Sequence, residues 1–272
     1  MITDSLPKGV FSTKRLPSYE REMESNYFAA ARSRKLDEFK DGERQRVLRH
    51  VLDNFEVNER AVDTRLRVLT LPGSHWHFER MIEHELGEYK ALFLGVERTW
   101  STLEFGLQYM PGRRKRHVRW SRGTRNLNAV LTSKGAVFNC QVEDWPHLSS
   151  VIPDEESGIH QIKNLRILST FNALWLDFFG PLMQPKIALL LRGLMGRIAS
   201  TADVVPYAFT GMYGRDFRGL AGGSVEARSE GIAAEFSSDK WSATPTDCWK
   251  YIGLNGTPMV TVCGLLRRNK VA

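Results

Sequence analysis

The sequence has few cysteines and lacks the short motifs that mark two large enzyme classes. Its 272 residues include three cysteines, Cys140, Cys248 and Cys263, and no two of them have C-x-x-C spacing. Such scattered cysteines exclude a disulfide framework and favour a reducing compartment. Neither Gly-x-Ser-x-Gly nor a Gly-rich phosphate loop ending in Gly-Lys-Ser/Thr occurs, so serine hydrolase and P-loop readings have no support.

Long apolar segments are also missing. The first ten residues carry Asp4 and Lys8 and offer no apolar core of a secretory signal. The longest uncharged run, Tyr251 to Leu266, is too short for a membrane span and contains a turn at Asn255 to Pro258. We therefore expect a soluble, cytoplasmic protein with no membrane partner.

The composition is that of a globular protein with an excess of positive charge. Hydrophobic residues make up 42% and charged residues 25%, so the chain should fold by ordinary burial. Lys and Arg number 38 against 31 Asp and Glu, which gives a net charge of +7. A polyanionic partner such as nucleic acid fits this balance.

The chain divides near Leu66 into a helical segment and a region of alternating strands and helices. Residues 1–64 form the first part, with apolar residues at helical spacing from Lys35 to Glu56, and residues 65–272 form the second. We expect strands at Leu66–Leu71, Ala91–Val96, Ala136–Val142, Ala173–Leu176 and Asp203–Thr210, helices at Trp76–Leu86, Thr99–Tyr109, Ile187–Ala199 and Val225–Phe236, and a terminal hairpin of Trp249–Leu254 with Met259–Leu265. This order predicts an α/β fold with a mostly parallel sheet covered by helices on both faces.

A basic segment from Arg113 to Arg125 interrupts this alternation and is predicted to be a loop. It holds seven Arg and Lys residues and no acid. Guanidinium groups can contact phosphates in pairs of hydrogen bonds, and an indole can stack on an unpaired base. The candidate nucleic-acid-binding residues are Arg113, Arg114, Lys115, Arg116, Arg119, Trp120 and Arg122. A solvated loop without a partner is the alternative.

Three acids follow predicted strands, namely Glu97, Asp144 and Asp177. In an open parallel sheet, ligands bind beyond the carboxyl ends of the strands, and a carboxylate after the second strand can accept hydrogen bonds from both hydroxyls of a ribose. Each acid could instead cap a helix or face solvent.

Together with the turn Leu71 to Ser74, the strand ending at Asp177 and the final hairpin, these acids resemble class I S-adenosylmethionine-dependent methyltransferases. The resemblance covers roughly Leu66 to Arg267 and implies a Rossmann-like domain behind an N-terminal helical extension. Two departures stand out. Thr70 replaces the acid that usually opens the first loop, and Gly73 is the one glycine in it. Asp177 is followed by Phe-Phe-Gly-Pro, which is nearest to the Asp-Pro-aromatic-Gly of a guanine-methylating branch.

The resemblance implies S-adenosylmethionine as the cofactor and a role for each matching residue. Pro72 to Ser74 would lie under its methionine part, Glu97 would bind the ribose, and Asp144 and Trp145 would contact the adenine. With the neighbouring Leu71 and Arg98, the implied cofactor-binding residues are Leu71, Pro72, Gly73, Ser74, Glu97, Arg98, Asp144 and Trp145. The implied methyl-transfer residues are Asp177, Phe178 and Phe179.

Two functions remain open on the sequence. One is a methyltransferase acting on a DNA or RNA base, and the other is an inactive methyltransferase-like protein that binds nucleic acid or serves in assembly. A nicotinamide oxidoreductase is a third possibility, against which the terminal hairpin argues. The histidines His75, His77 and His84 lack an acid or cysteine at zinc-ligand spacing, so we predict no metal.

Overall fold

The protein is described here from a computed structural model of the chain. The structure describes residues 34–55, 65–72, 76–87, 90–122, 125–142, 144–150, 170–181, 185–213, 224–253 and 256–269. The helices are α2 (Arg34–Asn54), α3 (His77–Leu86), α4 (Trp100–Gly106), α5 (Pro185–Met195) and α6 (Val225–Phe236), with a 3-10 helix η1 (Trp145–Ser150). The strands are β1 (Leu66–Thr70), β2 (Ala91–Val96), β3 (Arg116–Arg122), β4 (Arg125–Thr132), β5 (Gly135–Asn139), β6 (Ala173–Pro181), β7 (Val204–Met212), β8 (Trp241–Ile252) and β9 (Pro258–Arg268).

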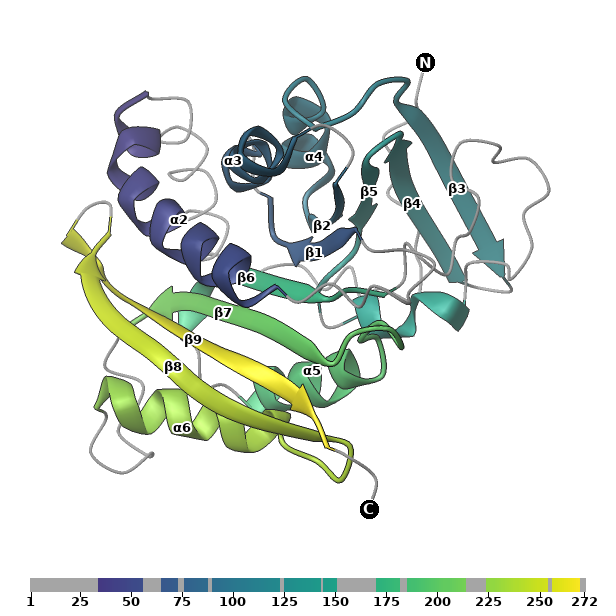
Figure 1. Ribbon diagram of the computed structural model, residues 1–272. Helices are drawn as coiled ribbons and strands as arrows, with labels where there is room; N and C mark the ends of the chain where they lie inside the picture. The colour runs from purple at the N-terminus through teal and green to yellow at the C-terminus, as the bar shows by residue number, and fades with distance from the viewer. Residues whose placement is uncertain are drawn as a thin grey trace.

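These strands form one mixed sheet. The described part of the chain contributes nine strands in the order β3-β4-β5-β2-β1-β6-β7-β9-β8 (Figure 1). The central strands β5, β2, β1, β6 and β7 are parallel, while β4 and β9 run antiparallel to their neighbours. This arrangement confirms the predicted α/β class and agrees with the Rossmann-like fold that the resemblance implies.

The order of the strands creates a switch point at the centre of the sheet. After β1 the chain forms β2 beside it, then the outermost strand β3, and comes inward through β4 to β5. It then crosses to the other side of β1 to form β6 and β7. Loops that follow β1 and β6 therefore lead away in opposite directions. In open sheets of this kind, the crevice at the carboxyl ends of the two strands is the usual ligand site.

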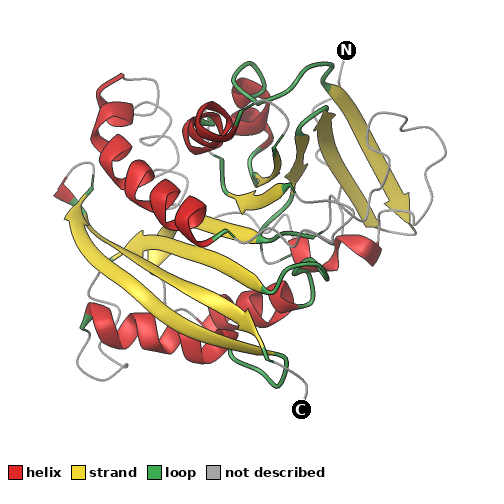
Figure 2. Cartoon of the chain, in the orientation of Figure 1, coloured by secondary structure: helices red, strands yellow, loops and turns green. Residues whose placement is uncertain are grey.

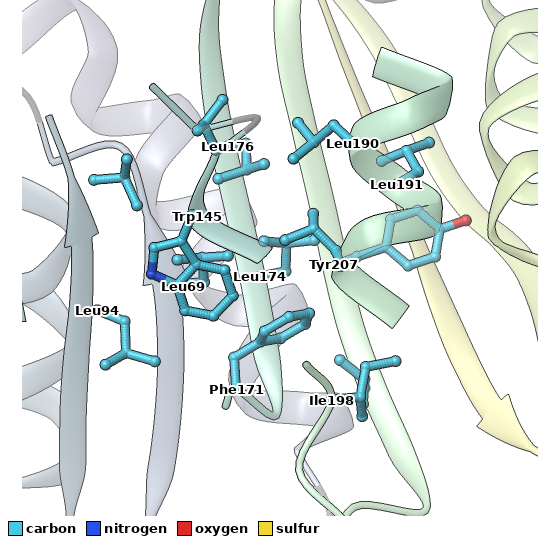
Figure 3. Close-up of a cluster of buried hydrophobic side chains, with 14 of the residues drawn as sticks. Leu69, Leu94, Trp145, Phe171, Leu174, Leu176, Leu190, Leu191, Ile198 and Tyr207 are labelled. Atoms are coloured by element: carbon cyan, nitrogen blue, oxygen red, sulfur yellow. The ribbon is translucent and has the colours of Figure 1, made fainter. Parts of the chain in front are cut away.

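Helices cover both faces of the sheet. Figure 2 shows α2, α3 and α4 over one face and α5 and α6 under the other. Alternate residues of a strand point to opposite faces, so Val68 packs into the core beneath α2 and α3, whereas Leu69 packs into the core against α5. The second core is built from large apolar side chains such as Phe171, Leu174 and Leu190 (Figure 3).

The long helix α2 belongs to the first of these cores. Val47 and Val51 are fully buried in the same cluster as Val68 of β1. His50 of α2 contacts β9, with its Nε2 3.2 Å from the carbonyl oxygen of Gly264. Residues 34–54 thus form part of the helical layer that covers the sheet.

The predicted basic loop is wrong, because β3 and the start of β4 occupy most of it. Val118 packs against the core and Trp120 is buried in it, while Arg119 between them is exposed. This alternation is that of a strand with one buried face. The density of arginine concealed the pattern in the sequence.

Three predicted boundaries are also corrected. Strand β6 does not end at Leu176 but continues to Pro181, so Asp177 lies inside the strand and pairs with Thr210 of β7. Strand β5 ends at Asn139 rather than Val142, which leaves Asp144 in the turn before η1. Strand β8 begins at Trp241, earlier than the predicted Trp249.

Candidate functional site

A buried acid of α3, not identified from the sequence, reaches the carboxyl end of β1. Thr70, the last residue of β1, donates a 2.5 Å hydrogen bond from its hydroxyl to Oε1 of Glu79 in the first turn of α3. Glu79 is 1% exposed, and its Oε2 has no hydrogen-bond partner in the described part of the chain. Burial raises the pKa of Glu79, while the Thr70 hydrogen bond and the charge of Arg44 act in the opposite direction.

Helical spacing explains why this glutamate is buried. Glu79 lies beside Phe78 and three residues before Ile82, and all three side chains face the sheet. A signal was therefore present in the sequence, since Glu79 occupies a position on the apolar side of an amphipathic helix.

Pro72 and Trp76, which flank the segment 73–75 between β1 and α3, pack closely against β2. Leu71 and Pro72 are half-buried, and the predicted cofactor residues Gly73 and Ser74 lie outside the described residues. Trp76 ends the loop in a left-handed conformation with φ of 55° and is 2% exposed. A Cβ atom at Gly95 of β2 would lie 2.7 Å from the Trp76 ring and 3.0 Å from the Pro72 ring. Glycine at this position is thus what allows Pro72 and Trp76 to approach β2.

Glu97 lies directly beyond β2, as predicted. Its Oε1 accepts a 2.9 Å hydrogen bond from the backbone N–H of Thr99, the residue that precedes α4. The Asn139 amide at the end of β5 donates to the carbonyl oxygens of Glu97 and Arg98, each at 3.0 Å. Two neighbouring strands thus fix the backbone of Glu97, and its carboxylate also holds the start of a helix.

Asp144 and Trp145 differ in their surroundings. Asp144 is half-buried in the turn after β5, where its backbone N–H donates to the carbonyl oxygen of Gln141 at 3.0 Å. Trp145 is 1% exposed and lies in the core below the sheet, 6.0 Å from the ring of Phe171 (Figure 3). Its indole is enclosed by core side chains, so the predicted contact of Trp145 with an adenine ring does not fit its position here.

Asp177 is engaged by the N-terminal helix. Nζ of Lys40 in α2 is 2.7 Å from Oδ2 of Asp177, and the two side chains are 16% and 22% exposed. Phe178 points to the other face and stacks on Phe209, with ring centroids 6.2 Å apart. The side chain of Phe179 lies outside the description. Of the predicted methyl-transfer residues, Asp177 is thus the one seen on the α2 face.

The surroundings of Asp177 come from the two ends of the chain. Burial raises the pKa of Tyr251 in β8, and the negative charges of Asp177 and Glu43 act in the same direction. Glu43 of α2 also accepts a hydrogen bond from the indole N–H of Trp249. The helix α2 therefore connects Asp177 to the C-terminal hairpin.

The predicted nucleic-acid-binding residues are split between the two edges of the sheet. Strand β3 runs parallel to β5. Arg113 to Arg116 therefore lie at the amino edge, where the parallel strands begin, and Arg122 lies at the carboxyl edge, where they end. At about 3.3 Å per residue, the strand separates Arg116 from Arg122 by roughly 20 Å. The backbone of Arg122 is in β3, and its side chain is outside the description.

The side chains of β3 also differ in their exposure. Arg113, Arg114, Lys115, Arg116 and Arg119 are exposed. Trp120 is 3% exposed in the core that packs against α5, so its burial contradicts the prediction that it stacks on a base.

A row of polar residues joins the carboxyl half of β3 to Glu97. Arg119 of β3 pairs with Asn128 of β4, and Asn128 pairs with Asn139 of β5. Paired residues on adjacent strands face the same side of a sheet. Because Asn139 bonds the backbone of Glu97, the row leads from the exposed edge strand to the acid beyond β2.

Further features of the described residues bear on membrane and metal binding. No described helix is both long and apolar enough to cross a membrane. Within the same residues, no group of three or more His, Cys, Asp or Glu side chains could hold a metal ion.

Comparisons with known proteins give similarity to solved structures alone. No family model matches the chain, and no curated protein matches it. The structure of M. jannaschii TYW2 in complex with AdoMet is similar over 87% of this chain and 78% of that one, with 10% identity and a TM-score of 0.45. A 16S rRNA (adenine(1408)-N(1))-methyltransferase variant from Catenulisporales acidiphilia is similar over 85% and 93%, with 11% identity and a TM-score of 0.43.

One further structure is longer than this protein. The match to Pyrococcus horikoshii PH0793 covers 84% of this chain and 63% of that one, with 11% identity and a TM-score of 0.43. At these identities and scores the similarities carry no argument about what this protein binds.

Proposed function

We propose that this protein is an S-adenosylmethionine-dependent methyltransferase that acts on a nucleic-acid base. The observation that carries the proposal is the pair of acids at the carboxyl ends of the adjacent strands β1 and β2. Glu79 reaches the carboxyl end of β1, and Glu97 follows the adjacent strand β2. Nucleoside cofactors are bound at this place in open α/β sheets.

The residues present fit the cofactor in two respects. Glu97 has a half-exposed carboxylate on a backbone held by Asn139, which suits a ribose diol. The buried Oε2 of Glu79 has no partner in the described residues, which suits a cationic group. When bound, S-adenosylmethionine supplies a methyl group on a positively charged sulfur. The protein then has mainly to align the acceptor with that methyl group.

Asp177 is the proposed contact for the methyl acceptor. A carboxylate can accept a hydrogen bond from an exocyclic amine and so orient its nitrogen. In the structure, Oδ2 of Asp177 contacts Lys40, so an amine that binds Oδ2 would compete with the lysine. Phe179, two residues after Asp177, stays a proposed methyl-transfer residue.

The hairpin of β3 and β4 supports a polyanionic substrate. It extends the sheet on the side of β5 and β2. Arg119, in the carboxyl half of β3, pairs with Asn128, which pairs with the Asn139 that bonds Glu97. Exposed arginines at such an edge can hold phosphates while a base enters the site. Arg113 to Arg116, at the other edge, would contact a longer stretch of the same strand.

Isothermal titration with S-adenosylmethionine and S-adenosylhomocysteine tests the cofactor. We expect micromolar binding by the wild type and at least about tenfold weaker binding by Glu97→Gln, because an amide loses the charge that strengthens a hydrogen bond. Glu104→Gln, on the exposed side of α4, is the matched control and should bind as the wild type does. Absence of binding at millimolar ligand would overturn the enzyme assignment.

The second candidate is an inactive methyltransferase-like protein that binds nucleic acid. The packing of Pro72 and Trp76 against Gly95 favours it, because bulky rings take up space beside the first loop. This candidate predicts salt-dependent nucleic-acid binding without cofactor affinity. A nicotinamide oxidoreductase is less well supported, since the antiparallel pair β8 and β9 ends the sheet. The free cysteines of the described chain suit the cytoplasm, which we propose as its location.

A further inference from the structure

Glu79 is set apart from the other buried polar groups on the same face of the sheet. There, the indole N–H of Trp175 donates to the Thr210 hydroxyl at 3.2 Å, and the hydroxyls of Thr210 and Thr261 are 3.0 Å apart. These groups satisfy one another. Glu79 satisfies only Oε1, through Thr70, while Oε2 is equally buried and has no partner in the described residues.

Such an oxygen is costly unless something binds it. A buried acceptor without a donor loses its hydration and gains nothing in return, and the penalty is larger for a charged group. The charge of Arg44 lowers the pKa of Glu79, but Arg44 also forms a 2.9 Å ion pair with Asp41. The site therefore calls for an additional donor, and a positively charged one would suit the carboxylate best.

The position of Glu79 limits which donor this can be. Its carboxyl group lies against the last residue of β1, and β1 and β6 flank the switch point of the sheet. Thr70 stands where the resemblance leads us to expect an acid. A carboxylate reaches the same strand end from the first turn of α3 instead, and the Thr70 hydroxyl orients it.

We propose that Glu79 binds the ammonium group of the amino-acid part of S-adenosylmethionine, with Thr70 as the residue that positions its carboxylate. The inference rests on the proposed function and assigns a specific group of the cofactor to a specific side chain. An ammonium group offers three N–H donors and a full positive charge, which match the unsatisfied Oε2.

Two ligands separate this contact from the rest of the cofactor site. S-adenosylhomocysteine and 5′-methylthioadenosine are both uncharged at sulfur and share the nucleoside, but only the first carries the amino-acid group. We expect Glu79→Gln to weaken S-adenosylhomocysteine by about tenfold or more and to leave methylthioadenosine within about twofold, as measured by isothermal titration at pH 7. Glu85→Gln, exposed on the same helix, should change neither affinity.

A second variant guards against a folding defect. Thr70→Val keeps the shape of the side chain but removes the hydroxyl that holds Oε1, so it should weaken S-adenosylhomocysteine by about threefold without affecting methylthioadenosine. Thermal melting of each variant establishes that it is folded.

The outcomes distinguish the inference from the proposed function. If the folded wild type binds neither ligand, the proposed function fails and this inference fails with it. If the wild type binds both and Glu79→Gln weakens them equally, Glu79 supports the fold and the inference alone is overturned. Unchanged binding of both ligands by Glu79→Gln would overturn it as well.

Discussion

The two edges of the sheet use their polar side chains in different ways. At the amino edge, where the parallel strands begin, Asn172 and Arg268 hold backbone groups of neighbouring segments. Asn172 accepts from the backbone N–H of Arg67 at 2.6 Å and donates to the carbonyl oxygen of Arg65 at 3.0 Å. Arg268 donates to the carbonyl oxygen of Ala202 at 2.8 Å. Asn172 thus joins the starts of β1 and β6, and Arg268 joins the end of β9 to the segment before β7.

At the carboxyl edge, Asn139 also bonds the backbone of Glu97 and Arg98, but three pairs of side chains join different elements. Lys40 contacts Asp177, Thr70 contacts Glu79, and Trp249 donates to Glu43. A side-chain contact can be exchanged for a ligand without opening the backbone, whereas the amino-edge bonds cannot be lost without loosening strands. We infer that the amino edge serves stability and the carboxyl edge serves binding.

The largest expected effect is on the amino edge. Asn172 is 7% exposed, and Asn172→Ala leaves two backbone groups without their hydrogen-bond partner. We expect the free energy of unfolding to fall by about 3 kcal/mol. Urea denaturation measures it. Ligand affinity of the folded variant should stay within about twofold of the wild type. A loss of affinity without a loss of stability would contradict the division between the edges.

The next effect compares the two ends of β3. Arg119→Gln with Arg122→Gln and Arg125→Gln removes three charges at or near the carboxyl edge, and Arg113→Gln with Arg114→Gln and Arg116→Gln removes three at the amino edge. Since the change in net charge is the same, any difference reports position. We expect the first set to weaken single-stranded RNA binding about tenfold and to lower the salt slope by about two units.

Fluorescence anisotropy of a labelled oligonucleotide at several salt concentrations provides both values. The amino-edge set should change the affinity by less than about threefold. Equal losses for the two sets would show that RNA follows the whole hairpin, and a larger loss for the amino-edge set would reverse the comparison.

The central strands could be predicted because the signals for them are local. Strands β1 and β2 are short apolar runs that end next to Pro72 and Glu97, and their bounds agree closely with the prediction. Strand β3 was missed because arginines surround the alternating Val118 and Trp120. Burial of every second residue is visible in the structure, whereas composition alone favoured a loop.

The site was less predictable than the fold. Glu97 could be found because it follows an obvious strand. Glu79 escaped notice because a glutamate in a helix is ordinarily exposed, and only its spacing from Ile82 placed it toward the sheet. The contact of Lys40 with Asp177 joins residues 137 apart in the sequence, and no local pattern encodes such a pairing.

The smallest expected effect concerns this contact. Lys40→Met keeps the length and apolar stem of the side chain but leaves Asp177 without its cation. Because both side chains are partly exposed, we expect the free energy of unfolding to fall by only about 1 kcal/mol, between the values for surface and buried pairs. A double-mutant cycle with Asp177→Asn isolates the pair. If Lys40 competes with a methyl acceptor for Oδ2, Lys40→Met should tighten binding of the nucleic acid while Asp177→Asn weakens it. Equal weakening by both variants would show instead that the ion pair itself forms part of the substrate site.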